Sequence, residues 1–226
     1  MAQQSFAAVL AEEQPSANTR WQEIVTRVGT RIALVANKPA FQWDFRLFGS
    51  AEQNAFALPG GKVGIYEGIM PVCQSEAGLA VVMSHEIAHA IARHGSERMS
   101  HQAAVQSVGS VLGYAVRGSS QTGQNMLLNA YGAAAKYGVI LPYSRQHELE
   151  ADSIGLELMA SAGFDPSEAP RFWQRFAAAA TGPAPPTWAS THPSDTQRAA
   201  QLATLVPAAT PRYEAAPLRV GLGEML

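Results

Sequence analysis

The strongly apolar stretch VVMSHEIAHAI, at residues 81–91, contains two histidines and a glutamate within five consecutive residues. If this stretch is helical, His85 and His89 lie one turn apart, about 40° around the axis, and Glu86 lies about 100° from His85. Burying these three side chains without partners would cost several kcal/mol, which argues against an ordinary core helix. Two neutral imidazoles at this spacing bind zinc, while the glutamate stays off the metal and accepts a proton from zinc-bound water.

Composition narrows the class of protein and the ligands that any metal could have. The 226 residues are 47% hydrophobic and 15% charged, which is typical of a globular domain. The net charge of -2 gives no indication of a nucleic-acid partner. Cys73 is the single cysteine, so an internal disulfide and a cysteine-rich zinc site are both excluded. We expect one domain over residues 1–206 and a C-terminal tail over residues 207–226.

The residues before the motif predict a helix and a small sheet. Apolar residues at helical spacing predict a helix from Asn18 to about Ala36. Residues 41–47 alternate between apolar and polar side chains, which is typical of a half-buried strand. Residues 54–58 and 62–66 predict a strand pair, joined by a turn at residues 59–61 with the sequence Pro-Gly-Gly. The sheet therefore comes directly before the motif helix in the chain.

The motif helix is expected to run from Ser75, its N-cap, to His94, with Gly95 as its C-terminal stop. A metzincin site would take its third ligand from the same stretch. That pattern needs a glycine three residues after His89 and a histidine six residues after it. Those positions hold Ala92 and Gly95, so the third ligand must come from elsewhere. We interpret His94 as a cation-capable residue at a helix C-terminus.

Residues 144–156, SRQHELEADSIGL, contain the candidates for that third ligand. On a helix, Glu148 and Asp152 lie one turn apart, on a face where small residues such as Gly155 let another helix approach closely. Glu150 points about 160° away from Glu148, so the two cannot bind one metal. Glu148 is preferred, because Asp152 can then accept a hydrogen bond from a zinc-bound histidine. The alternative is a solvated acidic face, the usual state of a charge cluster.

The remaining segments carry weaker signals. Residues 100–137, rich in Ala, Gly and Ser, predict either a helical hairpin or lid beside the site, or an ordinary packed insertion. Residues 165–168, Asp-Pro-Ser-Glu, open a helix whose aromatic residues predict core contacts. A Pro-rich loop at residues 181–186 leads to His192, which could return to the metal side, and to a short helix containing Arg198.

Four segments together resemble one family. They are NAFALPGG at 54–61, HEIAHAIARH at 85–94, SRQHELEAD at 144–152 and HPSDTQR at 192–198. In this order they resemble the zinc metallopeptidases that include the CAAX prenyl proteases, the heat-shock membrane protease HtpX and periplasmic proteases of outer-membrane quality control. The resemblance covers residues 40 to 200. It implies an α+β, mostly helical, zincin-like fold with a small sheet packed beside the motif helix.

The resemblance also implies a role for each motif residue. His85, His89 and Glu148 would bind one zinc ion, and Glu86 would be the general base. His192 matches a family histidine placed over the site, which either supports the oxyanion of the transition state or occupies the metal's open position in a latent form. A site made of two histidines and a glutamate favours zinc over other divalent ions.

The family's substrate is a polypeptide held by strand addition to an active-site edge strand. The matching residues here are Asn54, Ala55, Phe56, Ala57 and Leu58. The resemblance implies a zinc endopeptidase that acts on unfolded or misassembled proteins in the cell envelope. No spanning helix or signal peptide is visible in the sequence, so the chain looks most like the soluble or lipid-anchored periplasmic branch, peripheral to the membrane. The alternatives are a latent zinc-bearing chaperone or binding module closed by His192, and a zinc hydrolase of a non-peptide substrate.

Overall fold

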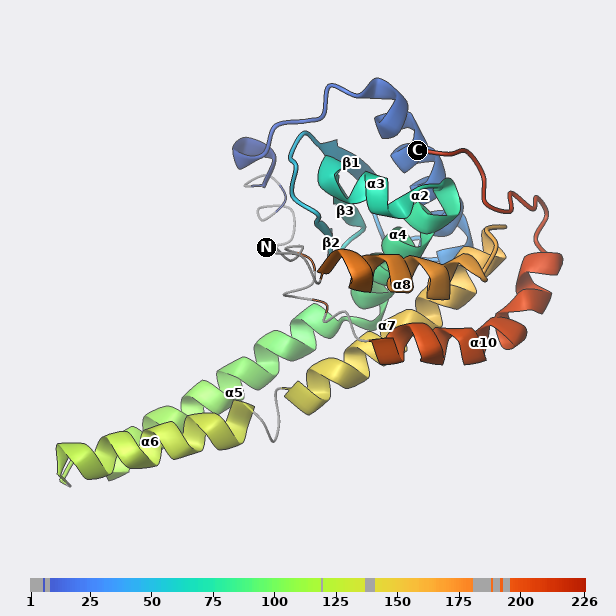
Figure 1. Ribbon diagram of the computed structural model, residues 1–226. Helices are drawn as coiled ribbons and strands as arrows, with labels where there is room; N and C mark the ends of the chain where they lie inside the picture. Colours follow the sequence, from blue (N-terminus) through green and yellow to red (C-terminus); the bar gives the residue numbers. More distant parts are fainter. Residues whose placement is uncertain are drawn as a thin grey trace. The chain divides into compact units, whose positions relative to one another are not determined.

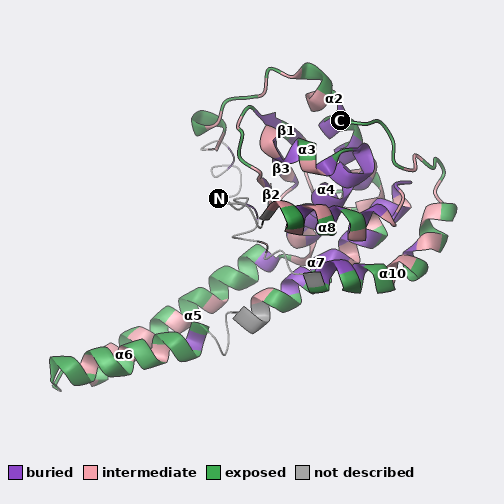
Figure 2. Ribbon diagram, viewed as in Figure 1, coloured by how far each residue is buried: buried purple, intermediate pink, exposed green. Residues whose placement is uncertain are grey.

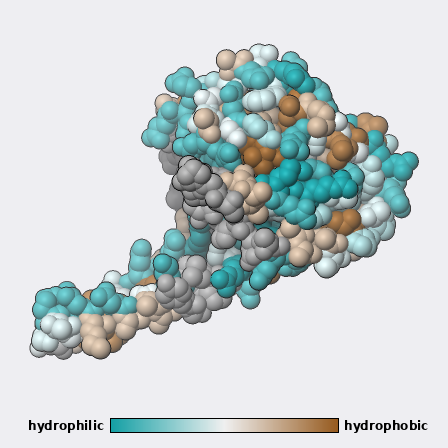
Figure 3. Space-filling view, in the orientation of Figure 1, coloured by the Kyte–Doolittle hydropathy of each residue, from teal (hydrophilic) through white to brown (hydrophobic). Residues whose placement is uncertain are grey.

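The structure is a computed structural model that describes residues 6, 9–118, 120–136, 141–180, 188, 192 and 196–226. Helices dominate the described residues, and three strands form one sheet, so the predicted α+β class is confirmed (Figure 1). The chain divides into two compact units, residues 1–92 with 150–226 and residues 93–149. Within the described ranges, no helix is long and apolar enough to cross a membrane. On the face shown in Figure 3, hydrophobic residues form small groups among hydrophilic ones.

The larger unit contains most of the elements. They are α2 (Thr19–Ala36), β1 (Asp44–Phe48), β2 (Ala55–Leu58), β3 (Lys62–Tyr66), the 3-10 helix η1 (Glu67–Ile69), α3 (Met70–Cys73), α4 (Glu76–Ala92), α8 (Glu168–Ala180) and α10 (Thr196–Glu214). The smaller unit contains α5 (His94–Ala115) and α6 (Gln121–Ala135). Helix α7 (Leu141–Ser161) is continuous across the division between Leu149 and Glu150.

The sheet has the strand order β1-β3-β2, with β1 parallel to β3 and β2 antiparallel to it. The predicted strand pair is confirmed as β2 and β3, and the turn between them uses Gly60 and Gly61 at φ values of 91° and 95°. The strand predicted over residues 41–47 instead begins at Asp44. The reason is that Gln42 donates its backbone N–H to the Gly60 carbonyl, in the turn that precedes β3.

The two edges of the sheet differ in how their backbone groups are bonded. On β1, the Leu47 N–H donates to Gln22 Oε1 at 2.8 Å, and Gln22 Nε2 donates to the Phe45 carbonyl at 3.0 Å. The Ser16 N–H donates to the Leu47 carbonyl at 2.9 Å. Side-chain and loop groups thus cover β1, as is common at edges that must not pair with another chain. The opposite edge of the sheet is β2.

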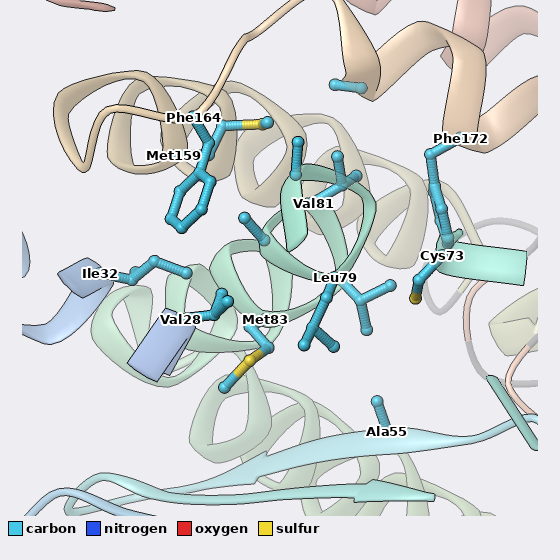
Figure 4. Close-up of a cluster of buried hydrophobic side chains, with 14 of the residues drawn as sticks. Val28, Ile32, Ala55, Cys73, Leu79, Val81, Met83, Met159, Phe164 and Phe172 are labelled. Atoms are coloured by element: carbon cyan, nitrogen blue, oxygen red, sulfur yellow. The ribbon is translucent and has the colours of Figure 1, made fainter. Parts of the chain in front are cut away.

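Helix α4, which carries the motif, lies at the centre of the larger unit and packs against α2, α8 and β2. It is buried from Glu76 to Ala88, and its visible part is mostly purple in Figure 2. Figure 4 shows the side chains that surround it, among them Val28 and Ile32 of α2 and Phe172 of α8. A helix that is apolar on every side is typical of a buried position. Packing on all sides therefore fixes the direction in which each motif residue points.

The ends of α4 correct one prediction and confirm another. The helix was expected to reach His94, but it ends at Ala92. Arg93 has a left-handed φ of 64°, and His94 begins α5. The interpretation of His94 as a residue at the C-terminus of the motif helix is therefore wrong. At the other end, Ser75 Oγ accepts a hydrogen bond from the Gly78 N–H at 3.2 Å, as expected of an N-cap.

The chain after residue 195 is more helical than predicted. The short helix expected around Arg198 is α10, which extends to Glu214. Pro207 and Pro211 lie inside it, and both are exposed. Water can therefore reach the carbonyl groups that lose their intrahelical donors at these prolines. Beyond α10, the carbonyl of Glu224 accepts the Glu76 N–H at 2.9 Å, so the last residues satisfy a donor at the start of α4.

In the smaller unit, α5 and α6 pack together as the predicted helical hairpin. Tyr131 on α6 donates its hydroxyl to the Val105 carbonyl on α5 at 2.9 Å. The start of α5 is tied to α7 through His147, whose ring stacks on His94 with the ring centres 4.0 Å apart. His147 Nε2 lies 3.0 Å from Glu97 Oε2. These contacts hold together the three helical segments of the unit.

Candidate metal centre

The structure brings the three predicted ligands and His192 together. Each of His85, His89, Glu148 and His192 offers one ligand atom, and these four atoms lie within 4.8 Å of one another. His85 and His89 come from α4, Glu148 from α7, and His192 from the chain between α8 and α10. Glu148 is buried and Glu150 is exposed, which confirms that the two carboxylates lie on different faces of α7.

The spacing of the imidazole nitrogens fits a metal ion. His85 Nε2 lies 3.1 Å from His89 Nε2 and 3.2 Å from His192 Nδ1. Two nitrogens that bind a tetrahedral zinc ion at its usual bond length lie about 3.3 Å apart. A neutral imidazole carries only one N–H, so its other ring nitrogen presents a lone pair. Where several such lone pairs converge, they repel one another unless a shared proton or a cation lies between them. The four side chains of the cluster supply only imidazole nitrogen and carboxylate oxygen atoms, a donor set that suits zinc.

Asp152 and Arg198 contact His85, the first of the candidate ligands. Asp152 Oδ1 lies 3.1 Å from His85 Nδ1. A hydrogen bond from Nδ1 to this carboxylate leaves the Nε2 lone pair of His85 directed at the cluster. Arg198 binds Asp152 through two hydrogen bonds of 2.6 and 2.7 Å, and its guanidinium carbon lies 3.6 Å from the centre of the Trp173 ring. Burial raises the pKa of Asp152, but the hydrogen bonds and charge of Arg198 outweigh it, and the pKa is lowered overall.

Gly155 allows α7 to lie against the motif helix. A methyl group at this position would lie 3.1 Å from the His85 backbone nitrogen and 3.2 Å from the His85 Cα. Ala151, one turn earlier, is fully buried. The prediction that small residues on α7 let another helix approach closely is therefore confirmed. This close approach places Asp152 beside the His85 ring.

The variant Gly155→Val tests whether this close approach holds the site together. Valine would force the α7 backbone away from His85, so we expect the free energy of unfolding to fall by about 1–3 kcal/mol. The contact between Asp152 and His85 would be lost, and zinc affinity should fall about 10- to 100-fold. Urea denaturation and competition with a chromophoric zinc chelator measure the two effects.

The matched control is Gly132→Val on α6, where an added Cβ meets no atom within 4 Å. Surface changes of this kind usually alter stability by less than about 0.5 kcal/mol. A Gly155→Val protein that is as stable and binds zinc as tightly as the control would show that the close approach is unimportant.

Glu86, the proposed base, is buried beside the four ligand residues. Its Oε1 accepts a hydrogen bond from Trp188 Nε1 at 2.8 Å and lies 3.3 Å from His192 Nε2. Sequence reasoning assigned no role to Trp188 or to Arg198. Arg198 lies within the motif HPSDTQR, which could have directed attention to it. Trp188 follows the Pro-rich segment predicted as a loop, residues 181–186, which lies outside the described residues. No periodicity in that segment indicates which way a side chain points.

The residues predicted to bind substrate lie at the β2 edge. The Asn54 carbonyl accepts the Tyr66 N–H at 3.1 Å, so this pair is hydrogen-bonded, just before β2 begins. Hydrogen-bonded pairs in an antiparallel ladder recur at every second residue, which directs the backbone groups of Ala55 and Ala57 outward. Asn54 Oδ1 accepts the outward Ala55 N–H at 2.9 Å.

Comparisons with known proteins give consistent matches. Residues 17–206 match the family described as Peptidase family M48. The mitochondrial metalloendopeptidase OMA1 of Schizosaccharomyces pombe is 40% identical over 192 residues, which cover 84% of this chain and 54% of that protein. Its counterpart in Saccharomyces cerevisiae is 38% identical over 170 residues, covering 73% of this chain and 47% of that protein. The beta-barrel assembly-enhancing protease of Escherichia coli is 32% identical over 185 residues, which cover 79% of this chain and 37% of that protein. The chain thus spans about half the length of the first of these relatives.

Proposed function

Because this chain belongs to peptidase family M48, we propose that it is a zinc-dependent endopeptidase that cleaves unfolded or misassembled polypeptides. The observation that carries the proposal is the convergence of four ligand atoms within 4.8 Å, beside the buried carboxylate of Glu86. The names of the relatives, metalloendopeptidase and beta-barrel assembly-enhancing protease, support both the reaction and a role in envelope quality control.

Under this proposal, His85, His89 and Glu148 would hold the zinc ion and Asp152 would orient His85. The bound ion would supply Lewis-acid chemistry, which polarises a carbonyl and lowers the pKa of water in the site. Glu86 takes a proton from the attacking water and delivers it to the leaving amine. His192, which is only partly buried, supports the oxyanion.

The β2 edge supplies the polypeptide-binding part of the proposal. A substrate in extended conformation adds to residues 54–58 as a further strand, through the outward carbonyl of Ala55 and the outward backbone groups of Ala57. A displaced or unfolded segment offers a free extended backbone, whereas the backbone groups of a folded protein are already paired. This difference supports a preference for unfolded and misassembled chains.

The proposal is tested by cleavage of unfolded casein and of a tightly folded protein of similar size. We expect casein alone to be cut, the activity to disappear when a chelator removes the metal, and zinc to restore it. Retention of full activity in the metal-free protein would refute the zinc mechanism. Turnover of small esters or amides without any cleavage of polypeptides would favour a hydrolase of non-peptide substrates.

A second candidate is a latent zinc-bearing chaperone or binding module. The favouring observation is the position of His192 Nδ1, 3.2 Å from His85 Nε2 and within the group of four ligand atoms. Zinc sites with four protein ligands are usually structural, because they leave no position for water or substrate. In this form His192 closes the site.

The variant His192→Ala separates the two candidates. If His192 supports the oxyanion, removing it should lower kcat about 100-fold while zinc stays bound to the three other ligands. We expect this fall in a casein assay, with the zinc content measured on the same sample. An increase in cleavage would instead identify His192 as the residue that closes a latent site.

We also infer that the protein works in the bacterial periplasm, peripheral to a membrane. Relatives in Escherichia coli and Vibrio cholerae that are named for β-barrel assembly support this location. Other relatives are named as mitochondrial, so the location requires its own test. Fractionation of the native cells should recover the protein with periplasmic and membrane markers; recovery with cytoplasmic markers would refute the inference.

A further inference from the structure

Trp188 contacts the proposed base directly from within an aromatic cluster, and its ring centre also lies 5.8 Å from that of His85 and 5.0 Å from that of His192. Its indole N–H donates to Glu86 Oε1 at 2.8 Å, and its side chain is fully buried. The ring stacks on Trp173, with the ring centres 5.2 Å apart and the planes at 16°. Phe176 packs against it edge-on, with the ring centres 5.0 Å apart. The indole is thus held on several sides, with its single donor pointing at the carboxylate.

We propose that Trp188 is a positioning residue for Glu86, which holds one carboxylate oxygen so that the other is free to take the proton from water. This inference rests on the proposed function, in which Glu86 is the general base. It extends that function to a residue outside the zinc ligands and outside the His-Glu-x-x-His motif.

The chemistry of the indole suits this role. The terminal torsion of a glutamate side chain is broad, so a carboxylate without a fixed partner samples many orientations. An indole N–H is a donor only and does not titrate, so it binds Oε1 without taking the proton that the base must carry. A positively charged partner would hold the carboxylate more strongly, but it would also oppose protonation of the base.

The backbone of Trp188 connects the base with two other parts of the site. Its N–H donates to the carbonyl of Gln53 at 3.0 Å, directly before the proposed substrate-binding residues 54–58. Its carbonyl accepts the N–H of His192 at 2.8 Å. One residue therefore fixes Glu86 relative to the end of the β2 edge and relative to His192. A loose indole would disturb the alignment of base and substrate without removing a metal ligand.

Trp173 provides a matched control within the same cluster. Its ring is also buried, but its Nε1 has no hydrogen-bond partner among the described residues. Among the described residues, loss of the indole N–H at this position removes no hydrogen bond. Benzothienylalanine at this position keeps the bicyclic ring that stacks on Trp188 and faces Arg198, so this Trp173 control changes the N–H alone.

The first experiment replaces Trp188 with benzothienylalanine, which keeps the bicyclic ring and exchanges only the N–H for sulfur. Trp188→Phe and the Trp173 control, which carries benzothienylalanine in place of Trp173, are made in parallel, all in the full chain loaded with zinc. We expect kcat on a fluorogenic peptide to fall about 10- to 100-fold for both Trp188 variants, because a hydrogen bond to a charged group is lost. KM, zinc content and thermal midpoint of the sulfur variant should match wild type, and the Trp173 control, whose ring contacts are unchanged, should keep the wild-type kcat.

The second experiment needs no activity. Indole N–H groups labelled with nitrogen-15 are observed by NMR in the zinc-loaded wild type and in Glu86→Gln, with the Trp188 signal assigned from its absence in Trp188→Phe. The Trp188 signal should exchange slowly with water and shift when the carboxylate becomes an amide, whereas the Trp173 signal should not move. Equal shifts at both tryptophans, or none at Trp188, would overturn the proposed contact.

The outcomes also separate this inference from the proposed function. If wild type cleaves peptides and the sulfur variant is equally active, Trp188 is a packing residue and only this inference fails. If the sulfur variant loses kcat together with its zinc, Trp188 acts through the metal site and the positioning role is wrong. If neither the zinc-loaded wild type nor the zinc-loaded His192→Ala variant cleaves peptides, the endopeptidase function fails. The NMR shift alone then decides whether Trp188 binds Glu86.

Discussion

Replacing Glu86 with Gln is expected to abolish casein cleavage while one zinc ion stays bound per chain. Glutamine has almost the same shape as glutamate but cannot accept a proton at neutral pH. General-base catalysis contributes about 10²- to 10⁴-fold to kcat, so the residual activity should fall below detection in a standard assay. His85, His89 and Glu148 are unchanged in this variant, which is why the metal should remain. Zinc content by mass spectrometry and cleavage are measured on the same preparation.

The control for this variant is Glu157→Gln on α7. This substitution makes the same chemical change at an exposed position, where Glu157 Oε2 lies 3.1 Å from Arg212 Nη2. This protein should keep full activity and full zinc content. A fully active Glu86→Gln protein would contradict the assignment of the base. A Glu86→Gln protein without zinc would show that Glu86 contributes to the metal site, against the arrangement in which it stays off the metal.

The variant Arg198→Met should have the largest effect on stability. Arg198 and Asp152 are 4% and 5% exposed in their side chains and are joined by two hydrogen bonds. Removing one partner of a buried ion pair leaves an uncompensated charge and costs about 3–5 kcal/mol. Asp152 would then be free to protonate or reorient, and His85 would lose the carboxylate that orients it. We expect zinc affinity to fall about 10- to 100-fold as well.

Two further variants give this prediction its controls. Arg212→Met removes an arginine from the same helix, but its pair with Glu157 is more than half exposed on both sides, and such pairs contribute about 0–1 kcal/mol. The double variant Arg198→Met with Asp152→Leu removes both buried charges, so it should regain much of the stability without regaining zinc affinity. Urea denaturation of the metal-free proteins measures stability. An Arg198→Met protein as stable as Arg212→Met would show that the buried pair is not structurally important.

The sequence was most informative where the signal was local. The spacing of His85, Glu86 and His89 depends only on the helix period, and the same period identified Glu148 and separated it from Glu150. The strand pair around Gly60 and Gly61 followed from alternation and turn chemistry. These features are set by residues a few positions apart in the chain, and the structure reproduces them.

The sequence was least informative where a residue broke a local rule. Arg93 takes the left-handed conformation that usually calls for glycine, and this ends α4 two residues before the expected end. Pro207 and Pro211 usually stop a helix, yet α10 continues through both on an exposed face. All three residues are exposed, and local preference alone places the helix ends elsewhere than the structure does.

The partners of the site residues were also beyond local reasoning. Trp188 binds a residue 102 positions away, and Arg198 binds one 46 positions away. Neither distance corresponds to a helix or strand period, so only the fold brings these groups together. The ligands themselves could be proposed because zinc chemistry restricts the donor types to a few residues in the chain.

X-ray absorption at the zinc edge, together with the zinc content of the purified chain, tests the central claim most directly. The account predicts one zinc ion per chain, with nitrogen and oxygen ligands at about 2.0–2.2 Å and the outer-shell pattern of imidazole rings. His89→Ala should lose this signal, whereas His101→Ala on α5 should keep it. A protein that binds no stoichiometric zinc, or one whose zinc has a sulfur ligand at about 2.3 Å, would contradict the proposed metal centre.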